Sequence, residues 1–315
     1  MRVLVTGGAG FIGSHLTDRL LARADEVVVI DNYATGRRDN LPKEAAGLRV
    51  IEGDIADGVL VTSTFEEFRP SVVVHAAASY KDPDDWATDA ATNVVGTANV
   101  VQAARATGAG RLIYLQTALC YGLHPLEQPI TLDHPLRPGA SSYAISKTAG
   151  EHYVGLSGLD WVSFRLANAY GPRNVSGPLP TFYSRLTAGK PCFVMDTRRD
   201  FVFVSDLIDV LIKAVDGVGG PGAYHVSSGR DFSIEELFTA TIDALKVELP
   251  EPVEVRPRGE DDAYTILLDP SRTQADFAWA TSIPLGEGVA ATIDYYREYG
   301  ITDTYTHLKL EQLRA

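Results

Sequence analysis

The sequence predicts an α/β fold in which a doubly wound parallel sheet is followed by a smaller C-terminal α/β subdomain. Short runs of Val, Ile and Leu alternate with longer helical stretches along the first half of the chain. The runs are continuous rather than alternating with polar residues, which is typical of strands buried on both faces of a parallel sheet. A glycine-rich loop separates the first run from the first helical stretch. Repeated β–α–β units of this kind imply right-handed crossovers and helices on both faces of the sheet.

The composition is that of an ordinary globular protein and excludes several classes of function. The chain has 315 residues, of which 45% are hydrophobic and 22% are charged, so it can bury a large core. The formal net charge is −13, and basic residues occur in runs of two at most, so we expect no nucleic-acid or membrane surface. Two distant cysteines with no His or Cys at ligand spacing predict no metal site. The low cysteine count and the lack of a signal peptide or long apolar run predict a cytoplasmic protein.

The predicted elements of the first half follow the chain in order. Apolar runs predict strands at Val3–Thr6, Glu26–Ile30, Leu48–Glu52, Ser71–His75, Arg111–Gln116 and Trp161–Arg165. Helical stretches lie at Phe11–Arg23, Asp85–Thr107 and Ser142–Leu156. These elements predict a first domain over residues 1–170.

After residue 170 the regular alternation of predicted strands and helices gives way to a loop and short elements. Gly171–Pro180 is loop-like and is punctuated by prolines. Short elements follow at Phe182–Ala188, Phe201–Phe203, Ser205–Val215, Ala223–Val226, Ser233–Leu245, Val253–Arg256 and Glu287–Tyr299. We predict a subdomain over residues 171–315 whose loops close over the carboxyl ends of the sheet, where open α/β folds bind ligands. Some of its segments are expected to return to the main sheet.

A glycine loop predicts a dinucleotide site of the Rossmann type. Residues 6–13 read TGGAGFIG, directly after an apolar strand and at the start of a helix, which is the context that this motif requires. Gly7 and Gly10 let the backbone turn tightly and approach a pyrophosphate, whose charge is favoured at the start of a helix. Gly13 lets that helix pack closely on the sheet. The loop therefore predicts a dinucleotide cofactor.

Two acidic residues follow the next strands. Asp31 is placed to accept hydrogen bonds from a ribose diol and to repel a 2′-phosphate, which favours NAD over NADP, although Arg37 and Arg38 nearby leave NADP open. Asp54 either contacts the adenine amino group or caps the next turn. The remaining predicted NAD contacts flank these motifs and are Phe11, Ile12, Asn32, Ile55, Ala76, Ala77 and Ala78.

A tyrosine and a lysine at helical spacing indicate proton chemistry. In SSYAISKTAGE, Tyr143 and Lys147 are four residues apart and share a helix face. A free phenol has a pKa of about 10, and a nearby ammonium is expected to lower it. The pair can then remove a proton from an alcohol while hydride leaves for the cofactor. Thr117, at the carboxyl end of a strand, is expected to hold the substrate oxygen.

Several motifs together resemble the extended short-chain dehydrogenase/reductase family, in the branch of NAD-dependent nucleotide-sugar epimerases and dehydratases. They are TGGAGFIG, HAAA at 75–78, NVVGT at 93–97, TALCYG, YAISK, RLANAYGPR, RDFVFVSDL and FAWATSIPLGEGVAATIDYY. The resemblance runs over essentially the whole chain. It implies tightly held NAD, a nucleoside-diphosphate sugar substrate, a homodimer formed by a helix pair, and catalytic roles for Thr117, Tyr143 and Lys147.

The resemblance also implies residues that bind the substrate. Asn168 falls near the sugar diphosphate, and Arg199 matches a diphosphate-contacting arginine. Either Arg256 or Arg258, in RPRGEDD, matches a second one. In PLPTF, Pro180, Thr181 and Phe182 match the loop that holds the nucleobase. Lys81 either meets a substrate carboxylate or phosphate, or is a solvated loop lysine.

One departure from the family pattern favours epimerisation. Family dehydratases place Asp-Glu after the threonine and decarboxylases carry a Glu two positions after it, whereas Ala118 and Leu119 follow Thr117 here. Elimination needs such an extra acid or base. The sequence therefore favours an epimerase. The details of YKDP, TALCYG and PLPTF resemble an epimerase subgroup from bacterial polysaccharide and antibiotic-sugar pathways, and this resemblance implies a UDP-hexose or UDP-uronic acid substrate with C4 as the default carbon. Alternatives are a dehydratase or decarboxylase, net oxidation, and a non-catalytic NAD-binding regulator.

Overall fold

The centre of the molecule is a seven-stranded parallel sheet. The computed structural model describes residues 1–139, 141–259, 262–302 and 304–305. In spatial order the strands are β11 (Gly222–Val226), β6 (Asp160–Leu166), β5 (Arg111–Thr117), β4 (Val72–His75), β1 (Arg2–Thr6), β2 (Glu26–Asp31) and β3 (Leu48–Glu52). The order reverses between β1 and β4, and this switch point leaves a crevice at the carboxyl ends of the strands. The predicted doubly wound sheet is confirmed.

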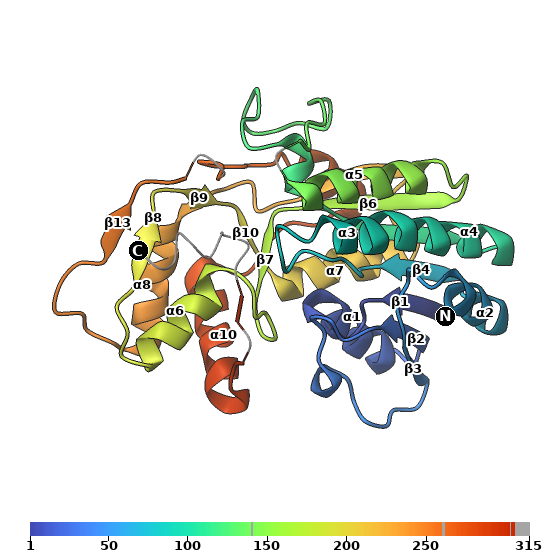
Figure 1. Cartoon of the computed structure of the whole chain (residues 1–315), viewed down its shortest axis with the longest axis horizontal. Coiled ribbons are helices and arrows are strands. Elements are labelled where there is room, and N and C mark those ends of the chain that lie inside the picture. The colour runs from blue at the N-terminus through green and yellow to red at the C-terminus, as the bar shows by residue number, and fades with distance from the viewer. Residues whose placement is uncertain (140, 260–261, 303, 306–315) are drawn as a thin grey trace.

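Helices cover both faces of this sheet (Figure 1). On one face pack α1 (Phe11–Ala22), α7 (Val204–Val215) and α9 (Ser271–Phe277). On the other pack α2 (Gly58–Phe68), α4 (Thr97–Thr107) and α5 (Ser142–Gly155). The strand residues alternate between these two cores, so Val3 and Val5 face α1 while Leu4 faces α2. Burial on both faces explains the continuous apolar runs in the sequence.

The long helical stretch before β5 is interrupted rather than uniform. It begins as α3 (Trp86–Asp89), continues as a π-helical segment over Ala90–Gly96 and ends as α4. The π-helical segment carries Asn93, which is fully buried. π-Helical turns occur frequently at functional sites, and this one lies beside α5.

A second group of elements packs around its own apolar core and lies to the left in Figure 1. Its helices are α6 (Pro178–Thr187), α8 (Ile234–Leu245) and α10 (Leu285–Tyr299). Short strands pair as β7 (Asn168–Tyr170) with β10 (Phe201–Phe203), β8 (Phe193–Met195) with β13 (Glu254–Arg256), and β9 (Arg198–Arg199) with β12 (Phe232–Ser233). The core of this group joins α6, α8 and α10 and is separate from the cores on the sheet.

The chain crosses between the two groups more than once. After residue 170 it returns to the sheet through α7, β11 and α9, as the sequence analysis allowed. The predicted loop over Gly171–Pro180 is wrong at its end, because Pro178 and Pro180 lie in the first turn of α6, where a missing N–H costs no helical hydrogen bond. In the part of the chain that the structure describes, helices are too short or too polar to cross a bilayer.

Candidate active site

The glycine loop lies at the switch point of the sheet, between β1 and α1. Gly7 has a φ of +68°, and a Cβ there would come within 2.7 Å of the backbone of Ala77, which follows β4. A Cβ on Gly13 would overlap the carbonyl oxygen of Gly7. Gly10 stands at the N-cap of α1 and has no side chain to cap the first-turn amides, which is the arrangement that favours a bound anion. The loop therefore fits the close approach of a pyrophosphate.

The carboxylate of Asp31 closes one side of this loop. It is 7% exposed and accepts hydrogen bonds from the amides of Ala9 and Tyr33, each 2.8 Å from a carboxylate oxygen. Burial raises the pKa of Asp31, and these backbone bonds oppose the change. Each carboxylate oxygen has capacity for a second donor. The buried, fixed carboxylate beside the anion site fits the ribose of a dinucleotide.

Arg37 and Arg38, the two arginines near Asp31 that could bind the 2′-phosphate of NADP, both form ion pairs with carboxylates. Arg37 pairs with Asp39 at 2.7 Å, and Arg38 pairs with Glu52 at 2.6 Å. Arg38 also lies over the ring of Tyr33, 4.2 Å from its centroid. A 2′-phosphate would compete with these carboxylates and with Asp31, so the structure adds to the case for NAD.

Asp54 takes the turn-capping role that the sequence analysis left open. Its carboxylate accepts from the amide of Ala56 at 2.8 Å and from the side-chain amide of Asn32 at 2.9 Å. Ile55 is buried, and its side chain packs against Gly96. A Cβ added to Gly96 would lie 2.6 Å from the Ile55 side chain. Asp54 and Asn32 thus form one polar pair at the carboxyl ends of β2 and β3.

Thr117 and Tyr143 meet at the carboxyl end of β5. Thr117 is the last residue of that strand, and Tyr143 is in the first turn of α5, which Ser141 caps. The hydroxyl of Thr117 lies beside the phenol of Tyr143 and opposes the rise in its pKa that burial causes. Burial raises the pKa of Tyr143, and the neighbouring Tyr80 and Asp89 raise it further. The predicted lowering of the phenol pKa is therefore wrong for this structure, because the cost of burying phenolate exceeds any attraction.

Lys147 lies one turn along the same helix, with its side chain buried at 2% exposure. Its ammonium stands 3.9 Å from the ring centroid of Tyr114. The backbone carbonyl of Lys147 accepts hydrogen bonds from the hydroxyl of Tyr114 at 2.9 Å and from the side-chain amide of Gln116 at 3.1 Å. Burial lowers the pKa of Lys147 to about 7, while Glu151 opposes this. The structure thus fixes the lysine between α5 and β5.

The loop after β4 carries residues that the sequence analysis did not assign. Asn93 holds this loop through the amide and carbonyl of Ser79, both at 2.9 Å, and donates to Ser146 of α5 at 3.0 Å. Tyr80 follows, with its ring centroid 5.8 Å from that of Tyr143. Their signals were present in NVVGT and SYKDP, but only the fold shows that the two segments meet at α5.

Two of the three predicted diphosphate arginines meet at one residue, Asp262. Arg199 donates to the carboxylate of Asp262 at 2.5 Å and to the carbonyl of Ala263 at 3.0 Å. The exposed Arg258 donates to the backbone carbonyl of Asp262 at 2.9 Å. Arg256 instead pairs with Glu254 within β13. The structure therefore brings Arg199 and Arg258 together. Glu260 and Asp261 of the same stretch lie outside the described residues.

The other predicted substrate residues lie in different environments. Asn168 is exposed at the start of β7 and donates weakly to the carbonyl of Asp200, at 3.3 Å. Thr181 donates to the carbonyl of Gly177 at 2.9 Å. Pro180 and Phe182 are buried in the C-terminal group, with Phe182 against Phe238. The structure does not bring those two rings to the crevice.

Lys81 is exposed on the loop after β4, and its ammonium lies 5.8 Å from the ring centroid of Tyr305. This contact keeps the cation on the side of the loop that faces the Tyr80 and Tyr143 rings.

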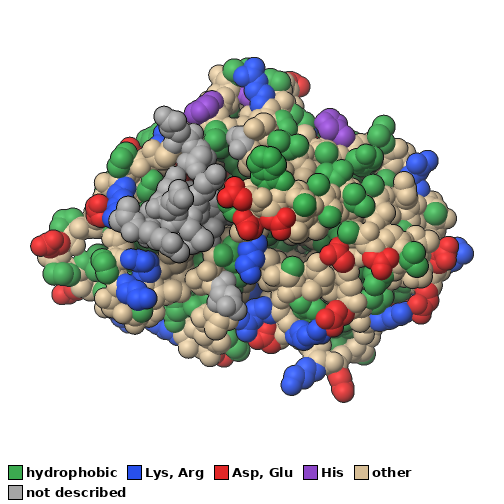
Figure 2. Space-filling view, in the orientation of Figure 1, with side chains coloured by type: hydrophobic (Ala, Val, Ile, Leu, Met, Phe, Trp, Pro, Cys, Tyr) green, Lys and Arg blue, Asp and Glu red, His purple; other side chains and the backbone are tan. Residues whose placement is uncertain are grey.

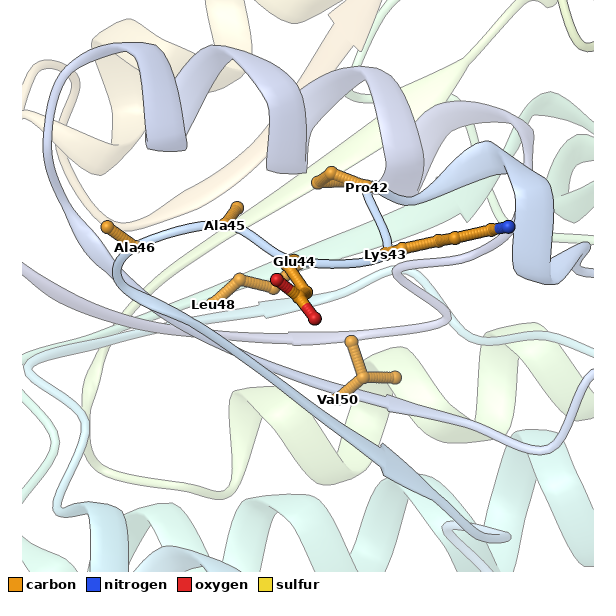
Figure 3. A pocket seen from close by; sticks show the side chains of 7 residues that line it. All are labelled: Pro42, Lys43, Glu44, Ala45, Ala46, Leu48 and Val50. Atoms are coloured by element: carbon orange, nitrogen blue, oxygen red, sulfur yellow. The ribbon is translucent and has the colours of Figure 1, made fainter.

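A separate surface hollow lies beside the edge strand β3 (Figure 3). Its lining residues are Pro42, Lys43, Glu44, Ala45, Ala46, Leu48 and Val50. They belong to β3 and to the connection before it, and they include none of the predicted site residues. The crevice at the glycine loop remains the candidate site.

Known proteins resemble the chain over nearly its whole length. Residues 3–227 match the NAD dependent epimerase/dehydratase family. A UDP-glucose 4-epimerase from Mycolicibacterium smegmatis is 36% identical over 314 residues, which cover 94% of this chain and 99% of that protein.

Solved structures agree with this match. The Bordetella bronchiseptica enzyme WbmH in complex with NAD+ is 57% identical with a TM-score of 0.92, covering 96% of this chain and 100% of that one. The enzyme WbmG of the same organism, in complex with NAD and UDP, is 47% identical with a TM-score of 0.92, covering 98% and 99%. Sequence match, strand order and site geometry all agree, and the chain belongs to the NAD dependent epimerase/dehydratase family.

Proposed function

We propose that this protein is an NAD-dependent epimerase of a nucleoside-diphosphate sugar, acting at C4 of a UDP-hexose or UDP-uronic acid in carbohydrate biosynthesis. One observation carries the proposal: Thr117 ends β5 beside the buried phenol of Tyr143, at the carboxyl end of the sheet, and Lys147 follows on the next turn of α5. The similarity to UDP-glucose 4-epimerase and to NAD-bound enzymes supports it. So does UDP in the related WbmG structure.

The residues divide the chemistry between them. Thr117 orients the reacting hydroxyl of the sugar, and Tyr143 takes its proton and later returns it. Bound NAD supplies the hydride acceptor and, for the reverse transfer, the hydride donor. Lys147, whose pKa burial lowers to about 7, shares its proton with solvent near neutral pH, and its backbone carbonyl is held by side chains of β5. Because burial keeps Tyr143 protonated in this structure, deprotonation depends on charge brought close to the phenol.

The glycine loop and its neighbours are the proposed cofactor site. Gly7, Gly10 and Gly13 admit the pyrophosphate, and Asp31 accepts the ribose hydroxyls. The further proposed contacts are Phe11, Ile12, Asn32, Asp54, Ile55, Ala76, Ala77 and Ala78. The close approach of Gly7 to the backbone of Ala77, which only a glycine allows, and the fixed carboxylate of Asp31 support this assignment.

The proposed substrate site lies between the sheet and the C-terminal group. Arg199 and Arg258 bind the diphosphate, supported by their convergence at Asp262. Asn168 at the start of β7, Thr181 on α6 and Lys81 on the loop after β4 are the further proposed substrate contacts. Pro180 and Phe182 are buried in α6, so the proposed nucleobase contact of this segment falls to its backbone and to Thr181. The division into residues 1–170 and 171–315 follows this two-sided arrangement, with α7, β11 and α9 returned to the first unit.

Epimerisation is favoured over elimination by the turn after β5. Ala118 and Leu119 open a 3₁₀ turn over Ala118–Tyr121, and the Leu119 amide donates to Thr117 at 3.2 Å. These two side chains supply no acid or base where dehydratases and decarboxylases of the family carry one. A transient ketosugar that receives its hydride back on the opposite face needs none.

The test is incubation of the NAD-loaded protein with UDP-, dTDP-, GDP- and CDP-sugars in deuterium oxide, followed by NMR. We expect one UDP-sugar to equilibrate with its C4 epimer without taking up solvent deuterium. Release of CO₂ or a stable 4-keto-6-deoxy product would replace the proposal with a decarboxylase or dehydratase. Accumulating NADH would indicate net oxidation, and inertness towards the whole panel would indicate a regulator.

We further propose a cytoplasmic homodimer. The low cysteine count supports a reducing compartment. Helix α5 presents apolar side chains to solvent, with Ile145 51% and Leu156 75% exposed, and hydrophobic side chains gather over this helix in Figure 2. Together with the exposed Val95 and Trp86 beside it, they form a surface that suits a helix pair.

A further inference from the structure

A tyrosine from the end of the described chain lies against the proposed active site. The ring centroid of Tyr305 is 5.7 Å from that of Tyr80, and Tyr80 in turn is 5.8 Å from Tyr143. The hydroxyl of Tyr305 donates to that of Tyr80 at 2.7 Å. Burial raises the pKa of Tyr305, and the neighbouring phenols of Tyr80 and Tyr143 raise it further. Three phenol rings, tilted by 50° and 51° to one another, therefore lie in a row that ends on the proposed acid/base.

The backbone of Tyr305 is attached to a different part of the molecule. Its amide donates to the carbonyl of Val175, and its carbonyl accepts from the amide of Gly177, both at 3.1 Å. These bonds make a parallel bridge between Ser176 and Tyr305. Gly177 is the N-cap of α6, the helix that carries the proposed substrate residue Thr181. Tyr305 thus connects the substrate side of the crevice with the phenol row.

A second attachment shows how the segment reaches this place. Thr302 accepts a hydrogen bond from Arg37 at 2.7 Å, close to the proposed ribose carboxylate, Asp31. The chain therefore leaves α10, contacts the connection after β2, and then pairs with the residues before α6. Tyr305 is therefore placed by its backbone bonds to Val175 and Gly177 as well as by its ring, and Thr302 has its own bond to Arg37.

We propose that Tyr305 is a positioning residue for Tyr143: it fixes Tyr80 against the acid/base and ties both phenols to the N-terminus of α6. The inference rests on the proposed epimerase function. It acts through Tyr80, since the Tyr305 side chain contacts the hydroxyl and the ring of Tyr80, while the ammonium of Lys81 stays 5.8 Å from the Tyr305 ring centroid. A misplaced acid/base slows the chemical step more than it weakens binding.

The test compares variants of the full-length, NAD-loaded protein on the UDP-sugar identified above. We expect Tyr305→Ala to lower kcat by roughly 30-fold while KM and NAD affinity change less than about twofold. Tyr305→Phe keeps the ring and loses only the hydroxyl contact, so its kcat falls by about threefold. Tyr299→Ala removes a C-terminal tyrosine that is 65% exposed and serves as the matched control, with native kinetics.

A double-mutant cycle with Tyr80→Ala separates positioning from a general structural role. If Tyr305 acts through Tyr80, the double variant has the kcat of Tyr80→Ala alone. Multiplicative losses in the double variant, or losses that follow the melting temperature and NAD affinity, would overturn the inference. A lower KM with unchanged kcat in Tyr305→Ala would also overturn it, since that result describes a plug in the sugar site. If the wild-type protein converts no nucleotide sugar, the proposed function fails first and the inference with it.

Discussion

At the scale of single residues, the proposed chemistry depends on how burial affects two groups on α5. Burial raises the pKa of Tyr143 and lowers the pKa of Lys147 to about 7, so both side chains are held towards their neutral forms. The prediction from the sequence took into account only the attraction between the Tyr143 phenolate and the Lys147 ammonium. Desolvation acts on each group separately and is the larger effect here. The i, i+4 spacing was correctly interpreted as a shared helix, but its electrostatic consequence was not.

The phenol hydroxyl of Tyr143 is predicted to be indispensable. Tyr143→Phe removes the atom that exchanges the substrate proton, so kcat should fall by about 10²–10⁴-fold, with NAD still bound. The matched control is Tyr153→Phe, which changes a tyrosine on the same helix that is 42% exposed and should leave kcat unchanged. Epimerisation followed by NMR measures both. Near-native turnover in Tyr143→Phe would remove this residue from the mechanism.

Lys147 is predicted to make stability depend on pH above neutrality. The lowered pKa of about 7, compared with 10.5 for an ordinary lysine, means that the unfolded state binds more protons between these values. The free energy of unfolding of the NAD-free protein should therefore rise with pH in this window. Lys147→Met should make the free energy of unfolding less dependent on pH in this window and raise it at pH 7. Lys43→Met, at an exposed position, should keep the pH dependence of the wild type. Urea denaturation at several pH values is the measurement, and an unchanged slope in Lys147→Met would contradict the lowered pKa.

At the scale of elements, the glycine loop shows why a motif predicts better than a single residue. The tight turn, the open first turn of α1 and the close contact with Ala77 all follow from small residues at fixed positions. These requirements are local in sequence, so the loop, its strand and its helix could be predicted together. The first turn of α6 was missed because its prolines were interpreted as punctuation, although proline is also favoured at the start of a helix.

Gly13→Ala should damage both cofactor binding and stability. Its Cβ would overlap the Gly7 carbonyl and come within 2.8 Å of the Gly8 Cα, and backbone atoms cannot give way cheaply. We expect a loss of about 1–3 kcal/mol in the free energy of unfolding and at least tenfold weaker NAD binding by fluorescence titration. Gly286→Ala, in the first turn of α10 with open space around it, should be neutral or slightly stabilising. Equal behaviour of the two variants would contradict the steric argument.

At the scale of the whole molecule, the apolar surface of α5 is the feature that the fold of one chain leaves unexplained. Ile145 and Leu156 lie on the solvent side of the helix, opposite the buried Ala144, Lys147 and Val154. A helix that is apolar on its outer side is usually covered by a partner. The proposed homodimer would cover it and would also stiffen the helix that carries the Tyr143 hydroxyl.

The dimer prediction is tested by replacing exposed apolar residues of the α5 surface with arginine. The Ile145→Arg, Leu156→Arg double variant should elute and scatter light as a monomer of 34.0 kDa, whereas the wild type should have twice that mass. Val255→Arg is the matched control, because Val255 is 52% exposed on β13, far along the chain from α5. A wild-type monomer, or a double variant that stays dimeric, would place the interface elsewhere or remove it.

The sequence by itself determined the parallel sheet, the glycine loop, the Tyr143–Lys147 helix and the nucleotide-sugar enzyme branch. Each of these depends on residues that are close in the chain, either as buried runs or as motifs with fixed spacing. It also determined the lack of an acid or base directly after Thr117, since adjacent residues need no fold to be compared.

Only the tertiary structure decided which distant residues meet. It joined Asn93 to the loop after β4, brought Arg199 and Arg258 to Asp262, turned Phe182 into the core, and set Tyr305 against Tyr80. These contacts depend on how helices and loops pack across the sheet, and side-chain spacing in sequence carries no record of that packing. The pKa values followed in the same way, because desolvation is a property of the finished fold.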